Sequence, residues 1–331
     1  MQLFAFVNRK SGSRAGRKIF DWLSQQNLPV YDLHGSNDLK AFISKIRAAS
    51  KQKKERVVVI AAGGDGTISS VGEMLANNKI DAAIAPFPLG TGNELAYNAG
   101  WGGYFTDLRL DDYFVQFERA PVHEFDVWHA HTISEKGEPR VFRFQSFFSL
   151  GMDARVVYSH ALLQKKFPAL YRFRFMSLIW YVVFGVYEAF LRRIRIGKYL
   201  KISCGNQEIL APRAGIIHIL NIPTSGGHTD YFGHDLFEKK PPAGYAKPSV
   251  ADGMLEVSAT EGIRSFLKSV LKLGPVTRLG QVRQLELTAD VGHPQRIQVD
   301  GEKVDELMVE IKIRHAGKQK ILLGPGRRRG C

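Results

Sequence analysis

The sequence predicts an α/β fold in two parts: an N-terminal domain built on a parallel sheet, followed by a β-rich, mainly antiparallel C-terminal domain. Over the first hundred residues, short apolar runs alternate with amphipathic runs, which is typical of a parallel sheet flanked by helices. After about Phe117, short β-type runs joined by turn-rich segments dominate. The 331 residues, 44% of them hydrophobic, suffice for two cores and exclude a disordered or fibrous chain.

The expected first domain covers residues 1–118, and hydrophobic spacing indicates its elements. Residues 57–62 form an apolar run without alternation, as expected for a strand that is covered on both faces. Helices are expected where apolar residues recur every three or four positions. In chain order, the expected elements are a strand at 3–8, helices at 16–26 and 38–49, the strand at 57–62, a helix at 68–77, a strand at 82–87 and a short helix at 94–98.

The expected second domain covers residues 119–325 and consists mostly of strands. One helical region, residues 161–193, interrupts them. The expected strands are 124–132, 140–150, 201–204, 215–222, 255–259, 285–289, 296–299, 307–314 and 319–323.

The composition indicates an anionic partner. Lys and Arg number 46 and Asp and Glu 32, so the net charge is +14. Charge alone does not choose among nucleic acid, an acidic membrane surface and a polyphosphate nucleotide. The two cysteines, Cys204 and Cys331, exclude a disulfide scaffold and a cysteine-rich zinc site, and they favour a reducing compartment.

The sequence predicts neither a signal peptide nor a transmembrane helix. The N-terminus lacks a basic region before its apolar residues, so a signal peptide is not expected. The most apolar stretch, residues 176–187, has 12 residues, fewer than the roughly 20 that a spanning helix needs. We therefore expect a cytoplasmic protein whose membrane contact is peripheral.

Three glycine-bearing loops follow strands of the first domain, each before a helix. The carboxyl ends of strands form the binding crevice of an open α/β sheet. Glycines let backbone N–H groups approach phosphate oxygens, and helix N-termini favour anions. The candidate nucleotide-binding residues are Asn8, Lys10, Ser11 and Gly12 in the first loop, Gly63, Gly64, Asp65, Gly66 and Thr67 in the second, and Gly90, Thr91, Gly92 and Asn93 in the third.

Asp65 is the unusual member of these loops. A carboxylate would repel phosphate unless a cation lies between them, and Mg²⁺ bridging Asp65 and nucleotide oxygens resolves the conflict. Such an arrangement is typical of phosphoryl transfer, in which positioning and charge neutralisation supply most of the catalysis. A single loop of this kind is more often structural, but three in succession favour a nucleotide site.

Other phosphate-binding patterns are missing from the sequence. It contains no Gly-x-x-x-x-Gly-Lys-Ser/Thr loop, and no Gly-x-Gly-x-x-Gly follows the first strand. The protein-kinase signatures are also missing. No RNA-binding signature accompanies the positive charge, so nucleic acid is not an expected partner.

Taken together, the motifs resemble those of the diacylglycerol kinase family and its lipid-kinase relatives. The likeness begins with the second and third loops, 63–67 and 88–93, and with the first strand and its loop, 6–12. It continues over nearly the whole chain, in the family's order. The further matching segments are Leu95-Ala96, Trp101-Gly102-Gly103, 148–154, 220–223, Gly233-His234, 252–257 and 298–302.

The resemblance implies an ATP- and Mg²⁺-dependent kinase of lipid metabolism and signalling, which phosphorylates the free hydroxyl of membrane diacylglycerol to give phosphatidic acid. It implies catalytic roles for Asp65, Asp300 and Glu302, and the base that deprotonates the hydroxyl is not settled among these three. It also implies that Asp65 serves Mg-ATP. A second, structural Mg²⁺ site, by similarity to bacterial relatives, would use Ser249, Asp252 and the backbone of Met254.

Two alternatives stay open beside this reading. One is a sphingoid-base or ceramide kinase, which shares the glycine loops; the other is an inactive relative that binds lipid or nucleotide. Arg9 stands where the family usually has Pro, and Glu94 where it usually has Asp. A homo-oligomer has no support in the sequence.

A segment for contact with an acidic membrane surface is also expected. Residues 165–195 interleave aromatic and basic side chains, a pattern that suits the membrane interface. Trp180 and Phe184 are expected to contact lipid there. The alternative is a helix whose apolar face belongs to the core and whose basic residues are solvated.

Overall fold

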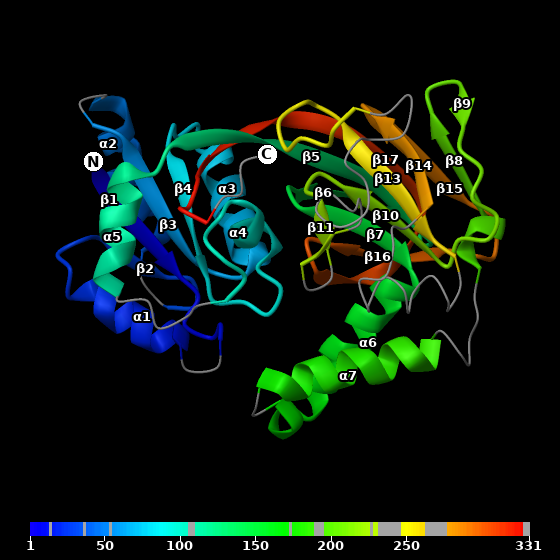
Figure 1. Cartoon of the computed structure of the whole chain (residues 1–331), viewed down its shortest axis with the longest axis horizontal. Helices are drawn as coiled ribbons and strands as arrows, with labels where there is room; N and C mark the ends of the chain where they lie inside the picture. The colour runs from blue at the N-terminus through cyan, green and yellow to red at the C-terminus, as the bar shows by residue number, and fades with distance from the viewer. Residues whose placement is uncertain are drawn as a thin grey trace. The chain divides into compact units, whose positions relative to one another are not determined.

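The computed structural model describes residues 1–12, 15–35, 38–52, 55–104, 110–171, 174–188, 195–225, 228–230, 246–261 and 277–326 (Figure 1). The chain divides into two compact units. The first comprises Met1–Phe125 and Lys318–Cys331, and the second comprises Asp126–Gly317. The strands β5 (Val122–Ser134) and β17 (Glu302–Leu322) contain the two boundaries. The sequence predicts a division into residues 1–118 and 119–325. It does not indicate that the residues after 317 belong to the first unit.

The first unit contains a parallel sheet in the strand order β17-β4-β3-β1-β2. Its strands are β1 (Gln2–Val7), β2 (Val30–Asp32), β3 (Val57–Gly63), β4 (Ala83–Pro88) and the end of β17, where Ile321 pairs with Ile84. Every residue of β3 is buried, which explains its unbroken apolar sequence. The predicted α/β class with a parallel N-terminal sheet is confirmed.

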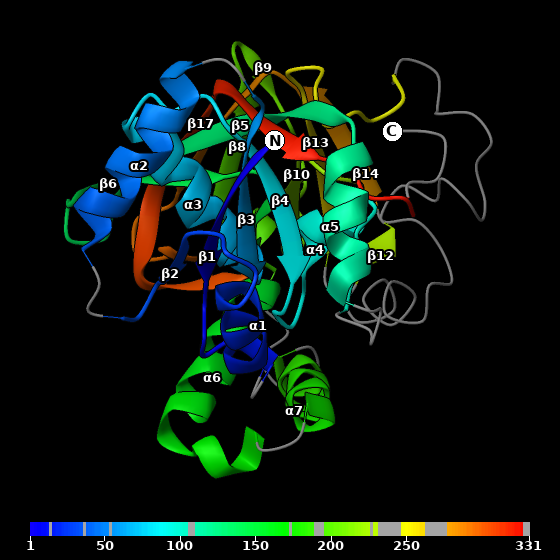
Figure 2. The ribbon, with the colours of Figure 1, turned by 90° about the vertical axis from the view of Figure 1, so that its left-hand side faces the viewer.

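Helices cover both faces of this sheet (Figure 2). The helices are α1 (Ala15–Ser24), α2 (Leu39–Gln52), α3 (Asp65–Asn77), α4 (Glu94–Asn98) and α5 (Leu110–Arg119). On one face, Phe42 of α2 packs edge-to-face on Phe6 of β1, with ring centroids 5.0 Å apart. On the other face, Tyr113 of α5 packs on Phe87 of β4 at 4.5 Å. Phe6 and Phe87 belong to adjacent rows of the sheet and therefore point to opposite sides.

The second unit is built from antiparallel strands. The order β14-β13-β10-β7-β16-β17 forms its main path, β15 joins β17 to β8, and β5 joins β17 to β6. The strands are β6 (Pro139–Phe144), β7 (Phe147–Gly151), β8 (Leu200–Cys204), β9 (Gln207–Glu208), β10 (Ile216–Leu220), β11 (Thr224–Ser225), β12 (Thr229–Asp230), β13 (Leu255–Thr260), β14 (Thr277–Val282), β15 (Gln284–Ala289) and β16 (Gln295–Val299).

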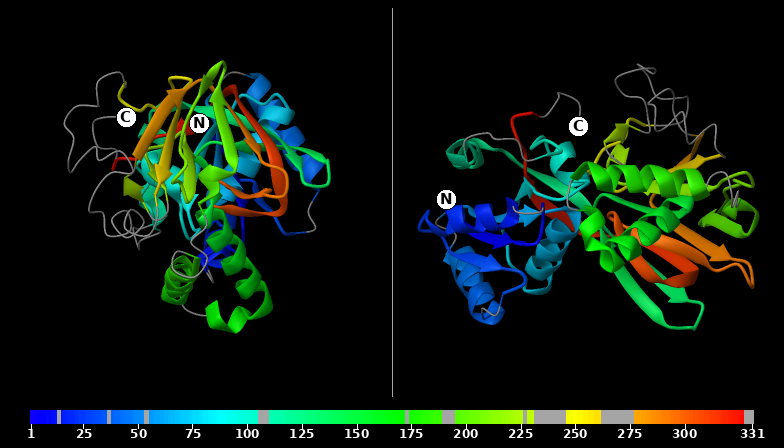
Figure 3. Two further views of the ribbon diagram at one scale, coloured as in Figure 1. Left: turned by 90° about the vertical axis from the view of Figure 1, so that its right-hand side faces the viewer. Right: turned by 90° about the horizontal axis from the view of Figure 1, so that it is seen from below.

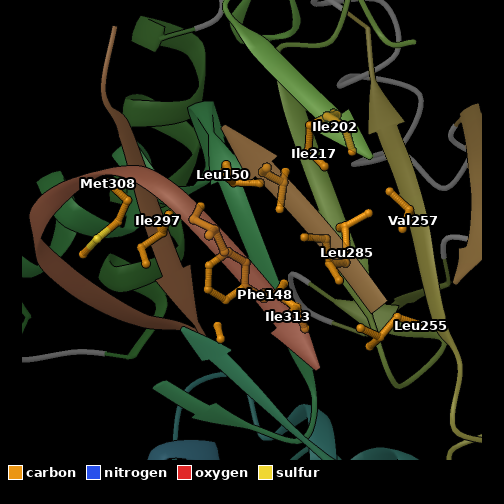
Figure 4. Close-up of a cluster of buried hydrophobic side chains, with 14 of the residues drawn as sticks. Phe148, Leu150, Ile202, Ile217, Leu255, Val257, Leu285, Ile297, Met308 and Ile313 are labelled. Atoms are coloured by element: carbon orange, nitrogen blue, oxygen red, sulfur yellow. The ribbon is translucent and has the colours of Figure 1, made fainter. Parts of the chain in front are cut away.

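The core of the second unit lies between these strands (Figure 4). Phe148, Leu150, Ile217 and Ile313 are fully buried there and come from three different strands. The outer face of β7 and β16 is covered by α6 (Met152–Lys166), on which α7 (Arg174–Tyr187) packs; a short 3-10 helix, η1 (Pro168–Tyr171), connects them (Figure 3). A further 3-10 helix, η3, spans Ile196–Lys198.

Several predicted elements differ from the observed ones. The run predicted as one strand at 140–150 is two strands, β6 and β7. The break has a physical cause: the carboxylate of Asp300 accepts the backbone N–H groups of Gln145 and Ser146, which therefore leave the ladder. Conversely, the two strands predicted at 307–314 and 319–323 are a single strand, β17. In the part of the chain that the structure describes, no helix is both long and apolar enough to cross a bilayer.

Candidate active site

Three loops of the first unit lie at one edge of its parallel sheet. They follow β1, β3 and β4, and the carboxyl ends of parallel strands share an edge. The loop after β1 begins at Asn8, that after β3 at Gly64, and that after β4 at Leu89. The structure therefore brings together the glycine-bearing segments that the sequence singled out.

Close backbone contacts join the loops to one another. A Cβ atom placed on Gly12 would lie 2.8 Å from the carbonyl oxygen of Leu89, and Gly12 also has a φ of +62°. A Cβ on Gly64 would lie 3.2 Å from the Cα of Gly90. Glycine is thus required at position 12, a side chain at position 64 would be tightly packed, and the first and second loops both pack against the third. This cradle of bare backbone fits a polyphosphate, whose oxygens need N–H groups without an intervening side chain.

The helix α3 presents its N-terminus at the same edge. Its N-cap residue is Gly64, which has no side chain with which to cap the first turn. The thirteen residues of α3 give it a positive dipole end at this point. Thr67, expected to donate its hydroxyl to a nucleotide, is buried and packs where a Cβ on Gly63 would clash with it.

Asp65 holds the third loop in place. Its Oδ2 accepts the backbone N–H of Glu94 at 2.9 Å, and its Oδ1 accepts that of Leu95 at 2.9 Å. The carboxylate thereby caps the N-terminus of α4 from a neighbouring loop, where a negative charge is favourable. An ionised carboxylate can also bind a cation, which is the role that the sequence predicts for Asp65.

Asn93 has a similar bracing function. It is 1% exposed and adopts the left-handed conformation, with a φ of +53°. Its Oδ1 accepts the N–H of Gly90 at 2.7 Å, and its Nδ2 donates to the carbonyl groups of Gly90 and Gly103, each at 2.8 Å. Asn93 therefore fixes the shape of the third loop, and its neighbour Thr91 is the exposed residue there.

The first loop is fixed by local bonds and by Arg9. The Oδ1 of Asn8 accepts the backbone N–H of Lys10 at 3.0 Å, and Lys10 is exposed at the loop surface. Arg9 forms an ion pair of 3.3 Å with Asp32 at the end of β2, and its guanidinium lies 4.8 Å from the centroid of Phe20. Arg9 thus ties the first loop to β2 and α1.

Asp300 lies in the second unit, in a two-residue hairpin loop. Val299 pairs with Glu302, and Asp300 and Gly301 both have positive φ, as a type I′ turn requires. Asp300 is 6% exposed, and its carboxylate accepts the N–H groups of Gln145, Ser146 and Phe147 at 2.8–3.1 Å. Burial raises the pKa of Asp300 to about 6, and the three N–H donors and Arg143 oppose that rise.

Glu302 and the predicted structural metal residues also lie in the second unit. Glu302 is exposed as a residue, and partial desolvation of its carboxylate raises its pKa. Asp252 accepts the N–H of Met254 at 2.9 Å, and Ser249 accepts that of Ala251 at 3.3 Å. Desolvation raises the pKa of Asp252, and the nearby carboxylate of Asp126 adds to the rise. Among the described residues, no three His, Cys, Asp or Glu side chains gather as a metal site.

Asp126 was not singled out from the sequence. It is fully buried, and its Oδ2 accepts the N–H of Gly253 at 2.6 Å while its Oδ1 lies 2.9 Å from Nε2 of His315. It therefore supports the turn that contains Asp252. A single aspartate within the strand 122–134 carries no local signal of this contact, which spans 127 residues of chain.

A row of polar side chains on the α6-facing side of the sheet was also missed. Ser258, His218, Ser149 and Gln298 occupy matching positions on β13, β10, β7 and β16. Gln298 donates to Ser149 at 2.8 Å and to Asp153 of α6, and Ser149 donates to Asp153 at 2.7 Å. Burial lowers the pKa of His218, although Asp153 opposes this. Through Asp153, this row of side chains fixes α6 on the sheet. The sequence did not reveal the row, because it depends on the register of four strands.

Comparisons with known protein families agree with this architecture. The family model for the diacylglycerol kinase catalytic domain matches residues 2–127, and that for the diacylglycerol kinase accessory domain matches residues 143–303. Together the two matches cover most of the chain. The catalytic-domain match begins in the first unit, and the accessory-domain match lies in the second.

Curated relatives give a consistent result. The chain is 26% identical to probable diacylglycerol kinase 3 of Caenorhabditis elegans, 27% to the eye-specific diacylglycerol kinase of Drosophila melanogaster and 28% to human diacylglycerol kinase iota. These alignments cover 99%, 94% and 95% of this chain, but 44%, 22% and 30% of the relatives. The chain thus spans less than half the length of each relative.

Solved structures show the same fold. A diacylglycerol kinase from Bacillus anthracis superposes with a TM-score of 0.58 at 14% identity, covering 99% of this chain and 98% of its own. Yeast NADH kinase, solved with NADH, superposes with a TM-score of 0.50 at 13% identity, covering 98% and 84% of the two chains.

Proposed function

Because the chain belongs to the diacylglycerol kinase family, we propose that it is an ATP-dependent lipid kinase that transfers the γ-phosphate of ATP to the free hydroxyl of 1,2-diacylglycerol, yielding phosphatidic acid. The observation that carries this proposal is the contact of three glycine-bearing loops at one edge of a parallel sheet. Such an edge, with an uncapped helix N-terminus, suits the phosphates of a nucleotide.

Within these loops, the described side chains divide into two groups. Asp65 and Asn93 hold the loops through backbone hydrogen bonds and so set the positions of the N–H donors. Lys10 and Thr91 are exposed and supply a cation and a hydroxyl to the phosphates. Preorganised donors of this kind stabilise the charge of a phosphoryl-transfer transition state without rearranging during the reaction.

Mg²⁺ would enter this site with the nucleotide. Nucleotide-bound Mg²⁺ takes only one or two carboxylates from a protein, with phosphate oxygens and waters as its other ligands. Asp65 is the carboxylate of the loops that would hold it, because its two hydrogen bonds to the start of α4 fix it beside the third loop. The metal would neutralise charge on the transferred phosphoryl group. The proposed structural Mg²⁺ site at Ser249, Asp252 and Met254 is distinct from this one, because its residues belong to the second unit.

The base that takes the proton from the acceptor hydroxyl is one of the carboxylates. Asp300 is nearly inaccessible and already accepts three N–H groups, so we assign it to positioning residues 145–147. This leaves Asp65 and Glu302 as the proposed candidates for the base. A base must lie within hydrogen-bond reach of the hydroxyl when the lipid is bound.

A phosphate-transfer assay on mixed micelles tests the proposal. The protein is incubated with labelled ATP and Mg²⁺ and with diacylglycerol, a sphingoid base or ceramide as separate acceptors. We expect label on diacylglycerol, and a loss of at least about a hundredfold in Asp65→Asn, because the positioning of the loop and the charge on the metal are both affected. Glu73→Gln, an exposed change on the same helix, serves as the control.

The outcome separates the alternatives. Label on a sphingoid base or ceramide in place of diacylglycerol identifies the other lipid-kinase activity. Nucleotide binding without transfer to any acceptor identifies an inactive relative. The proposed setting is the cytoplasm, with peripheral attachment to membranes that contain the lipid acceptor.

A further inference from the structure

The helix α7 is apolar on two opposite faces. One face packs inward: Tyr181 and Phe184 lie against Met152, Val156 and Ile216, and Tyr181 also stacks on His160 with ring centroids 4.0 Å apart. Trp180 lies 6.2 Å from Phe184 and has a buried indole nitrogen. Trp180 and Phe184, predicted as the lipid-contacting residues, therefore belong mainly to the packed face.

The opposite face of α7 is exposed. It carries the five residues Ile179, Val182, Val183, Val186 and Tyr187, which we call the α7 stripe. Their spacing of three, four, seven and eight positions places them along one side of the helix. Each is between 43% and 52% exposed. A soluble surface rarely presents five such residues in one line, so this face is suited to contact with an apolar partner.

Exposed apolar residues also occur at the end of α6 and in η1, the elements next to α7. Leu162, Phe167 and Leu170 are 38–47% exposed. Both α6 and α7 contact η1, and the two helices lie side by side on one side of the second unit's strands (Figure 3). Both helices and their connection thus carry exposed apolar side chains.

The charged side chains of this segment itself are positive, although the exposed Asp305 of β17 is close enough to Lys165 to interact with it. Lys165 and Lys166, in the last turn of α6, are exposed beside Phe167. The sequence from 159 to 187 contains four cationic residues and no Asp or Glu. The carboxylates that flank the segment are engaged elsewhere, because Glu188 pairs with Arg155 at 2.8 Å and Asp153 accepts the hydroxyl of Ser149.

We propose that the α7 stripe, with the end of α6 and η1, docks on the surface of a bilayer that contains anionic lipids. An apolar stripe with lysines at its margin matches an interface in which acyl chains lie below negative headgroups. The fourteen residues of α7 extend about 21 Å, less than the roughly 30 Å of a hydrocarbon core, so the helix is too short to span it. Because the exposed apolar residues run along one side of α7, the helix would lie in the plane of the surface. The choice of a lipid surface as occupant rests partly on the proposed function.

Vesicle co-sedimentation of the full chain tests the docking without requiring catalysis. The vesicles consist of phosphatidylcholine alone or of equal parts phosphatidylcholine and phosphatidylserine. We expect the wild type to bind the mixed vesicles more tightly. The triple variant Val182→Ser, Val183→Ser, Val186→Ser should bind them at least about tenfold more weakly, because three half-exposed valines no longer insert. Valine and serine have similar helix propensities, so α7 should persist.

The matched control removes the same number of exposed apolar side chains elsewhere in the second unit. Val141→Ser, Leu210→Ser, Val291→Ser alters residues that are 57%, 76% and 100% exposed and should leave vesicle binding unchanged. A second variant, Lys165→Gln with Lys166→Gln, should lose about tenfold on mixed vesicles and nothing on phosphatidylcholine alone. This variant decides the matter if the triple variant does not fold, as judged by circular dichroism.

Three results overturn the proposal. The first is a folded triple variant that binds as the wild type does, and the second is a wild type that binds neither kind of vesicle. The third is a wild type that self-associates in sedimentation velocity through the α7 stripe, which would identify a second copy as its occupant. Failure of the kinase proposal looks different: vesicle binding follows the expected pattern while no acceptor lipid is phosphorylated.

Discussion

Gly64 and Gly90 approach each other so closely that a side chain on Gly90 would overlap the backbone of Gly64. A Cβ on Gly64 would lie 3.2 Å from the Cα of Gly90, and a Cβ on Gly90 would clash with the Cα of Gly64 and lie 2.8 Å from Oδ1 of Asn93. Gly90→Ala should therefore push the second and third loops apart. We expect nucleotide affinity to fall at least about tenfold, measured by titration with a fluorescent ATP analogue.

A control for this change is available in the second unit. Gly280 lies in β14, and its nearest neighbour for a new Cβ would be the Val282 side chain at 3.7 Å, an ordinary contact. Gly280→Ala should leave nucleotide affinity unchanged. Equal affinities for Gly90→Ala and the wild type would remove the loops from the nucleotide site.

Trp101 anchors the end of β17 to the first unit. Its Nε1 donates a hydrogen bond of 2.7 Å to the carbonyl oxygen of Leu322, which is buried. Trp101→Phe keeps an aromatic ring but leaves that carbonyl without this donor, and it should lower the free energy of unfolding by about 1–3 kcal/mol. Urea denaturation measures the change. Trp22→Phe, at a half-buried ring that stacks on Phe114, should cost less; a larger loss there would contradict this role of Trp101.

Asp300 should act through position rather than through proton transfer. Asp300→Asn tolerates the positive φ but replaces one acceptor oxygen by an NH₂ group that faces an N–H donor. We expect a loss of about 1–3 kcal/mol in unfolding free energy at pH 7.5, with the turnover of the folded fraction reduced less than tenfold. A base would instead cost about 10²–10⁴ in rate. Asp305→Asn, an exposed change nearby in the sequence, is the control.

Glu256 gives the protein a defined pH dependence. Burial raises the pKa of Glu256 from 4.5 to about 7, although Gln281 donates a hydrogen bond to it. The folded state then binds this proton more tightly than the unfolded state does, so the stability from this group is full below about pH 4.5 and is lost as the pH rises to about 7. The loss amounts to at most about 3 kcal/mol.

The variant Glu256→Gln isolates this effect. It keeps an acceptor for Gln281 and removes the titration, so its unfolding free energy should change less between pH 4.5 and 7.5 than that of the wild type. Urea denaturation at the two pH values compares them. If the unfolding free energy changed equally between the two pH values in both proteins, Glu256 would not titrate in this range. The pKa values of Asp252 and Asp300 are also raised, so these two groups lower the stability with rising pH in both the wild type and the variant.

The part of the fold that depends on local pattern could be predicted from the sequence. The fully buried β3 appears as an unbroken apolar run, and the short helix α4 was predicted at its observed bounds. The convergence of the three loops also followed, because parallel strands end at one edge. What these loops bind remains a prediction from the same residues.

The missed features depend on contacts across long stretches of chain. The strand β2 has three residues, too few for a periodic signal. The middle of β17, residues 314–318, is mostly exposed and polar, so it lacks the alternation that would have joined its two halves. The capping of α4 by Asp65 and the bracing of residues 145–147 by Asp300 join partners 29 to 155 positions apart. No local pattern encodes them.

The pairing of Ile321 with Ile84 has a consequence for synthesis of the chain. The sheet of the first unit cannot be completed until residue 322 has left the ribosome, by which time all of 126–317 has emerged. Until then β4 presents an open edge, and a fragment that stops at residue 127, where the catalytic-domain match ends, would keep that edge permanently. The portion translated first is thus the one that finishes folding last.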